Sequence, residues 1–319
     1  MDRREFLAAA AAPLLLGAAP AFARPVGGTP LALVTADLEA GIVAVELSTG
    51  RIHRRLATPA DPRSIESVGH VGALVAHTGV GRLTYVDQQL RVHAIAGTLG
   101  APRYAAVPPG RMWAYVSDSA RAEIAVVDLR RRRVAARVPV GGPVRHLSVD
   151  PAGRTLWAVL GNVAARVAIL DLARPARPRL VREIRPPFNA HDVGFTPGGR
   201  RVWLTSGDRG RLAIYDARTA RVVRTLRGDA PPQHVTFLGD RAFVTSGDDA
   251  VLRVHALDGR LLRSASVPAG SYNVQEGFGM ILTPSLSQGT LCTFSARGAR
   301  VDQVRVARSS HDACFVMVP

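Results

Sequence analysis

Short hydrophobic segments of four to eight residues alternate with turn-forming residues along almost the whole chain. Residues 190–228 show the pattern most clearly: AHDVGFT, a Pro-Gly-Gly turn, RVWLTSG, a turn at Gly210, RLAIYDA and RVVRTLRG. The segments are rich in Val, Ile, Leu, Thr and aromatic residues, and Gly, Pro, Asp or Ser bounds each of them. This composition is typical of β-strands joined by tight turns. The stretch therefore predicts four antiparallel strands and an all-β fold.

The same four-strand unit recurs seven times. An acidic or small residue ends the third segment of each unit, at intervals of 37 to 45 residues: Glu46, Asp87, Asp128, Asp171, Asp216, Asp258 and Ser295. A period of roughly 40–45 residues is typical of one four-stranded blade of a β-propeller. We expect the acidic side chains to accept hydrogen bonds from backbone amides of the following hairpin. The sequence thus predicts a single seven-bladed β-propeller over residues 31–319.

The order of the segments predicts how the ring closes. The second strands begin at Leu31, Gly72, Met112, Thr155, Arg201, Arg241 and Met280, whereas the chain ends on a first strand, HDACFVMVP. The first unit therefore lacks an inner strand at the N-terminus, and the C-terminal strand can supply it. Such closure pairs edges that would otherwise be open. Pro284 lies inside the second strand of the seventh unit, where it removes a ladder donor and predicts a bulge.

Several segments carry a recognisable repeat motif. They are RHLSVDPAGRTLWAVLG at 145–161, HDVGFTPGGRRVWLTSG at 191–207, MWAYVSD at 112–118 and EIAVVDL at 123–129. These segments resemble the YVTN-repeat β-propeller family, and the resemblance extends over essentially all of residues 31–319. It implies a fold and no particular ligand, because the motif residues of that family are structural. WD40 repeats are the neighbouring alternative, but their Trp-Asp ending and Gly-His pair are absent from this sequence.

The first residues have the features of an export signal. Arg3 and Arg4 precede an uncharged run that two prolines interrupt, and Ala-Phe-Ala supplies a small-x-small cleavage site. The run is too short and too broken for a permanent membrane-spanning helix. The order Arg-Arg-x-Phe-Leu resembles the bacterial twin-arginine signal, and an ordinary secretory signal is the alternative. We expect a signal over residues 1–23, a linker over 24–30, and an exported protein that is periplasmic, surface-bound or secreted, with no membrane-spanning segment afterwards.

The charge of the chain restricts its partners. The 319 residues include 41 basic ones, all of them arginine, and the formal net charge is +16. A protein with this charge attracts anions. The run Arg130–Arg133 could therefore bind an anionic lipid or envelope polymer, although such a run is often only a solvated hairpin. Export argues against nucleic acid as the partner, and we expect a monomer.

The starts of the seven inner strands form the candidate site. Aligning the units places one pair of residues from each around one mouth of the central channel, where propellers usually bind ligands. The pairs are His311-Asp312, Ser64-Ile65, Arg103-Tyr104, Arg145-His146, His191-Asp192, Gln233-His234 and Tyr272-Asn273. The polar members predict a binding site for a small molecule or a protein partner. The structural alternative is that they satisfy free backbone groups of nearby turns.

Histidine and carboxylate side chains together can bind a divalent metal or act as acid and base near neutral pH. The metal candidates are His191, Asp192, His311 and Asp312. Neighbouring residues of a strand point to opposite sides. Histidines at the first and second positions of the pairs should therefore not converge on one ion unless the backbone is irregular.

Two acidic residues and two cysteines remain. Glu66 and Glu276 lie in inner strands, where a carboxylate needs a partner such as the mouth arginines; either could act as a general base. Cys292 and Cys314 align on strands of adjoining blades, which places them beyond disulfide reach. We expect both thiols to be buried and reduced.

No complete catalytic set accompanies these residues. The sequence contains no Gly-rich phosphate loop, no Ser-His-Asp order, no covalent haem motif and no zinc-ligand spacing. The leading hypothesis is therefore an exported ligand-binding or interaction protein that uses the channel mouth. The alternatives are a metal-dependent lyase or lactonase at the same rim, as in other propellers, and a subunit of a redox assembly.

Overall fold

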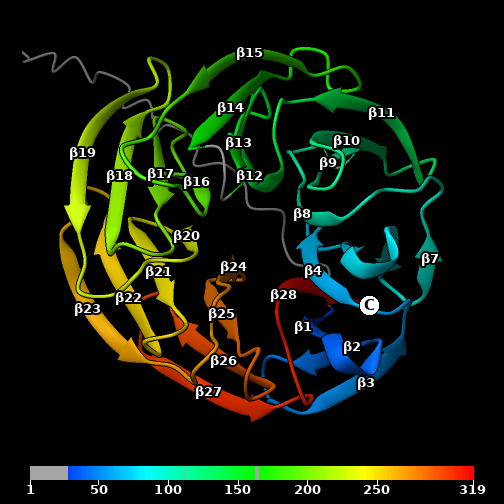
Figure 1. Cartoon of the computed structure of the whole chain (residues 1–319). Coiled ribbons are helices and arrows are strands. Elements are labelled where there is room, and N and C mark those ends of the chain that lie inside the picture. The colour runs from blue at the N-terminus through cyan, green and yellow to red at the C-terminus, as the bar shows by residue number, and fades with distance from the viewer. Residues whose placement is uncertain (1–27, 111, 162–164) are drawn as a thin grey trace, which may run out of the picture.

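Seven four-stranded antiparallel sheets are arranged in a ring (Figure 1). The computed structural model describes residues 28–110, 112–161 and 165–319, so the expected export signal lies outside the described residues. Blade 1 has the strand order β28-β1-β2-β3, and blades 2 to 7 follow in chain order from β4 to β27. The predicted seven-bladed β-propeller is confirmed. In the described part of the chain, no helix combines the length and the apolar character needed to cross a membrane.

Each blade runs from an inner strand at the axis to an outer strand at the rim (Figure 1). The inner strands are β28 (Ala313–Val318), β4 (Pro62–Ser67), β8 (Pro102–Ala106), β12 (Val144–Val149), β16 (Val193–Phe195), β20 (Val235–Leu238) and β24 (Gln275–Gly277). The second strands are β1 (Thr29–Ala36), β5 (Gly72–His77), β9 (Trp113–Asp118), β13 (Thr155–Leu160), β17 (Arg201–Thr205), β21 (Arg241–Ser246) and β25 (Met280–Pro284).

The remaining strands complete the blades. The third strands are β2 (Gly41–Glu46), β6 (Arg82–Asp87), β10 (Glu123–Asp128), β14 (Arg166–Asp171), β18 (Arg211–Asp216), β22 (Val251–Ala256) and β26 (Thr290–Ser295). The outer strands are β3 (Ile52–Ala57), β7 (Val92–Ala94), β11 (Arg133–Pro139), β15 (Arg179–Ile184), β19 (Arg221–Arg227), β23 (Leu261–Ser266) and β27 (Arg300–Arg305). Short 3-10 helices follow two of the second strands, at Asp37–Glu39 and Thr78–Val80.

The hydrophobic core is divided among the blade junctions. Each of seven buried clusters joins two neighbouring blades, and Leu31, Ile65 and Val75 belong to the one between blades 1 and 2. Second strands are covered on both faces and are almost continuously buried, as in β5, whereas outer strands such as β3 are mostly exposed. This explains why second and third strands are continuous hydrophobic runs, while arginine is common in the outer ones.

Acidic residues at the ends of third strands have the predicted local role, as Asp87 and Asp216 show. Asp87 accepts hydrogen bonds from the backbone amides of Gln89 and Arg91, both at 2.9 Å, through Oδ1. Asp216 accepts one from the backbone amide of Thr219, also at 2.9 Å. The recurring side chain therefore fixes the hairpin that leads to the outer strand.

The C-terminal strand closes the ring as predicted. β28 pairs antiparallel with β1, with Leu31 opposite Val316, and the backbone amide of Met317 donates to the carbonyl of His70 in blade 2 at 2.7 Å. The bulge predicted at Pro284 is wrong. That residue is the last of β25, where the ladder ends, and β25 pairs with β26 through Pro284 without a register shift.

Candidate functional site

One side chain from each blade lines a cavity of about 400 Å³ on the axis of the ring. We call these residues the cavity ring: Asp312, Ser64, Tyr104, His146, Asp192, His234 and Asn273. The residue before each of them forms a second set, the mouth ring: His311, Arg63, Arg103, Arg145, His191, Gln233 and Tyr272. The residue two positions after most cavity-ring members also lines the cavity, as the two-residue period of a strand requires: Glu66, Ala106, Ser148, Gly194, Thr236 and Gln275.

The alignment of blade 2 was wrong by one residue. Ser64 takes the second position of the pair and lines the cavity, while Ile65 packs in the core between blades 1 and 2. Arg63 is therefore a mouth-ring residue that sequence reasoning missed. The signal was present, because Pro62-Arg63 matches Pro102-Arg103 in the next blade.

Two aspartates of the cavity ring fasten neighbouring blades together. Asp312 Oδ1 accepts from the amide of Ala313 at 2.9 Å, and its Oδ2 accepts from the amide of Ile65 in blade 2 at 3.1 Å. Asp192 repeats this arrangement with Val193 at 2.7 Å and with Val235 of blade 6 at 3.0 Å. We call this arrangement the aspartate clasp. It supports the structural explanation for these two polar residues, with a backbone partner in the next blade.

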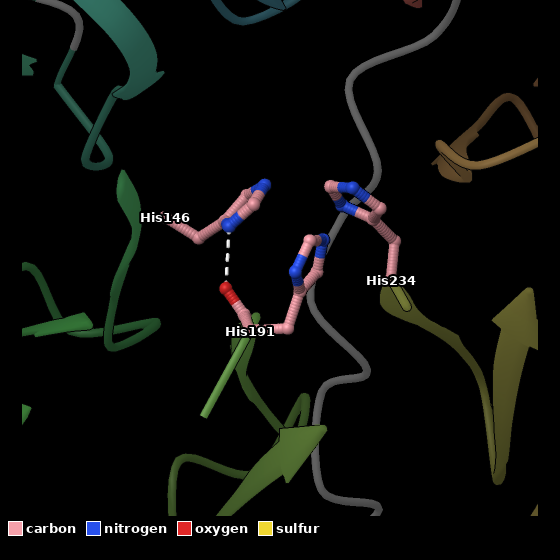
Figure 2. A group of neighbouring side chains, drawn as sticks. All are labelled: His146, His191 and His234. Carbon is pink, nitrogen blue, oxygen red and sulfur yellow. Dashed lines mark hydrogen bonds between the residues drawn. The ribbon is translucent and has the colours of Figure 1, made fainter. Parts of the chain in front are cut away.

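Two histidines also contact the backbone of the next blade. His311 Nδ1 lies 2.7 Å from the carbonyl oxygen of Arg63, and His146 Nδ1 is hydrogen-bonded to the carbonyl oxygen of His191 (Figure 2). Since a carbonyl oxygen only accepts, Nδ1 is the donor in both rings, which leaves Nε2 as the acceptor. In His146 that Nε2 atom is buried and has no hydrogen-bond partner.

Three histidines from consecutive blades converge at this end of the cavity, and two of them, His146 and His234, line it (Figure 2). One nitrogen from each of His146, His191 and His234 lies within 4.8 Å of the others. Ring centroids are 4.8 Å apart for His146 and His191, 4.4 Å for His146 and His234, and 5.2 Å for His191 and His234. Of the four predicted metal candidates, only His191 belongs to this group; Asp192 and Asp312 act in the clasps, and His311 contacts Arg63.

Backbone irregularity allows this convergence. The β12–β13 register shifts between Val144 and Leu147, so His146 does not follow the regular alternation. His191 and His234 precede their strands, which begin at Val193 and Val235. Strand alternation therefore does not keep these three histidines apart.

Burial keeps three imidazoles of this mouth, those of His146, His191 and His311, in their neutral form. Burial lowers the pKa of His146 well below its ordinary value, and His234, His191 and Arg145 lower it further. The pKa of His191 is lowered by burial, then by His234, Arg145 and His311. Burial and the nearby Arg63 act in the same direction on the pKa of His311. Neutral imidazoles can bind a metal without first losing a proton.

Three arginines occupy consecutive positions of the mouth ring. Arg63 lies 3.6 Å from Asp37, a partner that sequence reasoning did not anticipate, and Arg103 Nε donates to Ser119 Oγ at 3.3 Å. The pKa of Arg103 is lowered by burial and then by the positive charges of Arg145 and Arg63. Positive charge is therefore concentrated on the side of the mouth formed by blades 2 to 4.

Carboxyl groups mark the opposite end of the inner strands. Glu66 accepts a hydrogen bond at 3.5 Å from the Gln275 amide, so its partner is not the mouth arginine that we expected. Burial, followed by the nearby Asp312, raises the pKa of Glu66 to about 8. Glu276 is exposed and, with Glu66, lines a second hollow of about 540 Å³ at this end. Arginine and histidine side chains thus gather at one end of the channel, and the carboxyl groups of Glu66 and Glu276 lie at the other.

The cysteines are buried and free, as predicted. Cys292 lies in β26 and Cys314 in the inner strand of the next blade. Burial raises the pKa of Cys292 to about 11 and that of Cys314 in the same direction. Both thiols therefore stay protonated and poorly nucleophilic at neutral pH.

A glycine behind His191 makes room for its ring. Gly207 has a φ of +72°, and a Cβ added there would lie 2.8 Å from the Cβ and Cγ of His191. Gly247 has the same relation to Tyr272 in the next blade, with a closest approach of 2.5 Å. The two Thr-Ser-Gly-Asp segments, at 205–208 and 245–248, therefore set the position of mouth-ring side chains through their glycines.

Comparison with known proteins supports the fold and no single activity. No family model matches the chain, and no curated protein matches it. A protein of unknown function from Desulfotomaculum acetoxidans is 12% identical, with a TM-score of 0.79 over 91% of this chain and 99% of that chain. A candidate 6-phosphogluconolactonase from Bacteroides uniformis is 10% identical, with a TM-score of 0.72 over 91% and 100%. Hydrazine synthase from Kuenenia stuttgartiensis is 15% identical, with a TM-score of 0.66 over 79% and 88%.

The fold and the cavity together define a seven-bladed β-propeller with a polar axial site. At these identities the structural likenesses establish the fold alone.

Proposed function

We propose that this chain is an exported propeller of the YVTN-repeat type that binds a small organic anion at the axis. The observation that carries the proposal is a cavity of about 400 Å³ whose mouth has arginines on three consecutive blades. Ligand sites commonly occupy about 300–1,000 Å³ and combine a few placed polar groups with a preformed cavity.

The side chains at the mouth suit a carboxylate or phosphate group. Arg63, Arg103 and Arg145 offer planar guanidinium groups, which bind such anions through paired hydrogen bonds. Tyr104 and Asn273 line the cavity itself and add polar side chains that can contact the body of the ligand. Because the pKa of Glu66 is about 8, its carboxyl is largely uncharged at neutral pH and repels an anion little.

Thermal shift and calorimetric titration with a panel of dicarboxylates and sugar phosphates test this proposal. We expect at least one anion to stabilise the wild-type protein, and Arg103→Gln to weaken its binding by about 10-fold or more. Arg131→Gln is the matched control, because that arginine pairs with Asp128 on an outer hairpin. Binding that is equal in both variants, or no stabilisation by any anion, contradicts the proposal.

Export is the second part of the proposal and is tested separately. It rests on the arginine pair and the uncharged run of residues 1–23. We expect the protein outside the cytoplasm, and Arg3→Lys with Arg4→Lys to retain it inside if the twin-arginine route is used. Normal export of that variant indicates an ordinary secretory signal, whereas a wild-type protein found only in the cytoplasm contradicts export. An anionic envelope polymer binding to Arg130–Arg133 can be tested on the same exported material by sedimentation with cell-wall fragments.

The alternative function is a metal-dependent lyase or lactonase at the same mouth. The convergence of His146, His191 and His234 favours it over other enzyme classes, and one structural neighbour is a candidate 6-phosphogluconolactonase. Lactone hydrolysis by zinc-loaded protein, lost in His191→Gln, would support this alternative. Absence of turnover with sugar lactones and their phosphates would favour the binding protein.

A further inference from the structure

We infer that His146, His191 and His234 form a binding site for one transition-metal ion of the zinc and copper class. The three residues come from blades 4, 5 and 6, so the ring of blades and not a local motif brings them together. Within residues 28–110, 112–161 and 165–319, no other group of three histidine, cysteine or acidic side chains has this spacing.

The His146 ring is oriented as a metal ligand would be. His146 donates from Nδ1 to the carbonyl of His191, so its Nε2 lone pair is free and faces the space between the three rings (Figure 2). That Nε2 atom is buried and unpartnered, and His146 is only 2% exposed. A buried acceptor without a partner is costly unless something else satisfies it. A metal ion in the shared space would do so.

Two of the histidines also have an oxygen atom beside the ring nitrogen that would not bind the metal. A metal-bound histidine usually donates its other ring nitrogen to a backbone carbonyl or a carboxylate. The backbone carbonyl of His191 has this relation to His146, and Asp192 Oδ2 lies 3.5 Å from His234 Nδ1. The Asp192 carboxylate also adds negative charge beside the site, which offsets the nearby Arg145.

The ligand set selects the class of metal. Imidazole nitrogens suit zinc, copper and nickel, whereas magnesium and calcium prefer oxygen ligands. Three protein ligands with a position left open are typical of zinc sites that bind a further molecule. Two nitrogens at about 2.1 Å from one ion are at most about 4.2 Å apart. The separations of up to 4.8 Å therefore require a small inward rotation of the rings.

Metal titration of the tag-free wild-type protein with Zn²⁺, and with Co²⁺ as a visible probe, tests the site. We expect one ion per chain, and cobalt bands typical of four or five ligands. His146→Gln and His234→Gln should each raise the dissociation constant at least about 100-fold. His255→Gln is the matched control, because His255 is also buried, also contacts a carbonyl oxygen through Nδ1 and also has an unpartnered Nε2.

Two outcomes would overturn the inference: wild-type binding no tighter than the non-specific binding of the two site variants, or stoichiometric binding that both variants retain. A measurement on the wild-type protein guards against variants that fail to fold. X-ray absorption of the protein with one equivalent of Zn²⁺ should show nitrogen ligands at about 2.0 Å with imidazole outer-shell scattering. A shell of oxygen or sulfur alone would place the ion elsewhere. Neither readout depends on the organic anion, so the two proposals can fail separately.

Discussion

The junction between blades 1 and 2 and the junction between blades 5 and 6 use the same aspartate clasp with different surroundings. Asp312 and Asp192 each bind the amide of the following residue and an amide of the next blade. Near Asp312 lies Glu66, whose pKa is raised by burial and then by the Asp312 carboxyl. Asp192 instead lies beside a histidine, with its Oδ2 at 3.5 Å from His234 Nδ1.

This difference separates residues that hold the ring from residues that are available to a ligand. Both aspartates looked like candidate ligands in the sequence, but their oxygens accept backbone amides. In blade 4, His146 uses only Nδ1 for its contact with the backbone, which leaves Nε2 without a protein partner. A polar rim can therefore be structural at one junction and form a binding site at another.

Removal of Ser310–Pro319 should have the largest effect, since it eliminates the blade 1–2 clasp together with β28. The loss of a buried inner strand should exceed the total stability of about 5–15 kcal/mol typical of a domain. We expect insoluble or unfolded protein by circular dichroism, whereas a chain lacking only Pro319 should fold normally. Cooperative unfolding of the truncated chain at the wild-type denaturant midpoint would show that closure by β28 is dispensable.

Asp312→Ala and Asp192→Ala compare the two clasps directly. Each substitution leaves two amides without their acceptor, so each should destabilise the protein by about 2–4 kcal/mol in urea unfolding. Only Asp192→Ala should also weaken zinc binding, by about 10-fold, because its carboxylate lies beside His234. Equal effects of both variants on zinc would mean that the clasps do not differ in function.

The pH dependence of stability sharpens the comparison at the blade 1–2 junction. Burial raises the pKa of Glu66 from 4.5 to about 8, and that of Asp312 from 3.8 to about 8. The folded state keeps protons that the unfolded state releases above about pH 4–5. These protons contribute to the free energy of unfolding. The contribution is complete below about pH 4–5 and is lost as the pH rises through about 8.

We therefore expect the wild-type Tm to fall by a few degrees between about pH 6 and pH 9, and to fall less in Glu66→Gln. The groups that act on Glu66 are Asp312, Glu276 and the Gln275 amide. Glu183→Gln is the control, since Glu183 forms an exposed pair with Arg166. An unchanged slope in Glu66→Gln would show that its carboxyl is ionised in the folded protein.

Gly207→Ala should have the smallest effect and tests the blade 5–6 side alone. The added Cβ would meet the ring of His191 and displace it, so zinc should bind about 10-fold more weakly. Gly247→Ala is the matched variant, because its Cβ would meet Tyr272 instead. Zinc titrations that do not distinguish the two variants would remove His191 from the proposed ligand set.

The repeat made most of the fold predictable. The number of blades, their four strands, the hairpin role of residues such as Asp87 and Asp216, and closure by β28 all follow from short-range patterns. A strand and its turn carry their own signals, and the signals recur seven times. The error at Pro284 arose because the end of a strand is less well defined by sequence than its middle.

The candidate site was predictable only as a region. The sequence named six of the seven cavity-ring residues as second members of their pairs, and it missed the position of Ser64 because one unit was aligned a residue out of register. It also placed Glu66 near arginines that lie at the other end of the strand. Side-chain direction at strand ends depends on bulges and on residues before the strand, which periodicity does not describe.

By itself, the sequence determined the architecture, because each blade is specified by local hydrophobic and turn patterns that neighbouring blades repeat. The tertiary structure alone decided which rim residues meet. His146, His191 and His234 come from three different blades, and Asp192 is turned towards an amide instead of an ion. The distances between such residues depend on the irregular backbone at the start of each inner strand and on the closure of the whole ring, and neither is encoded in the spacing of any one motif.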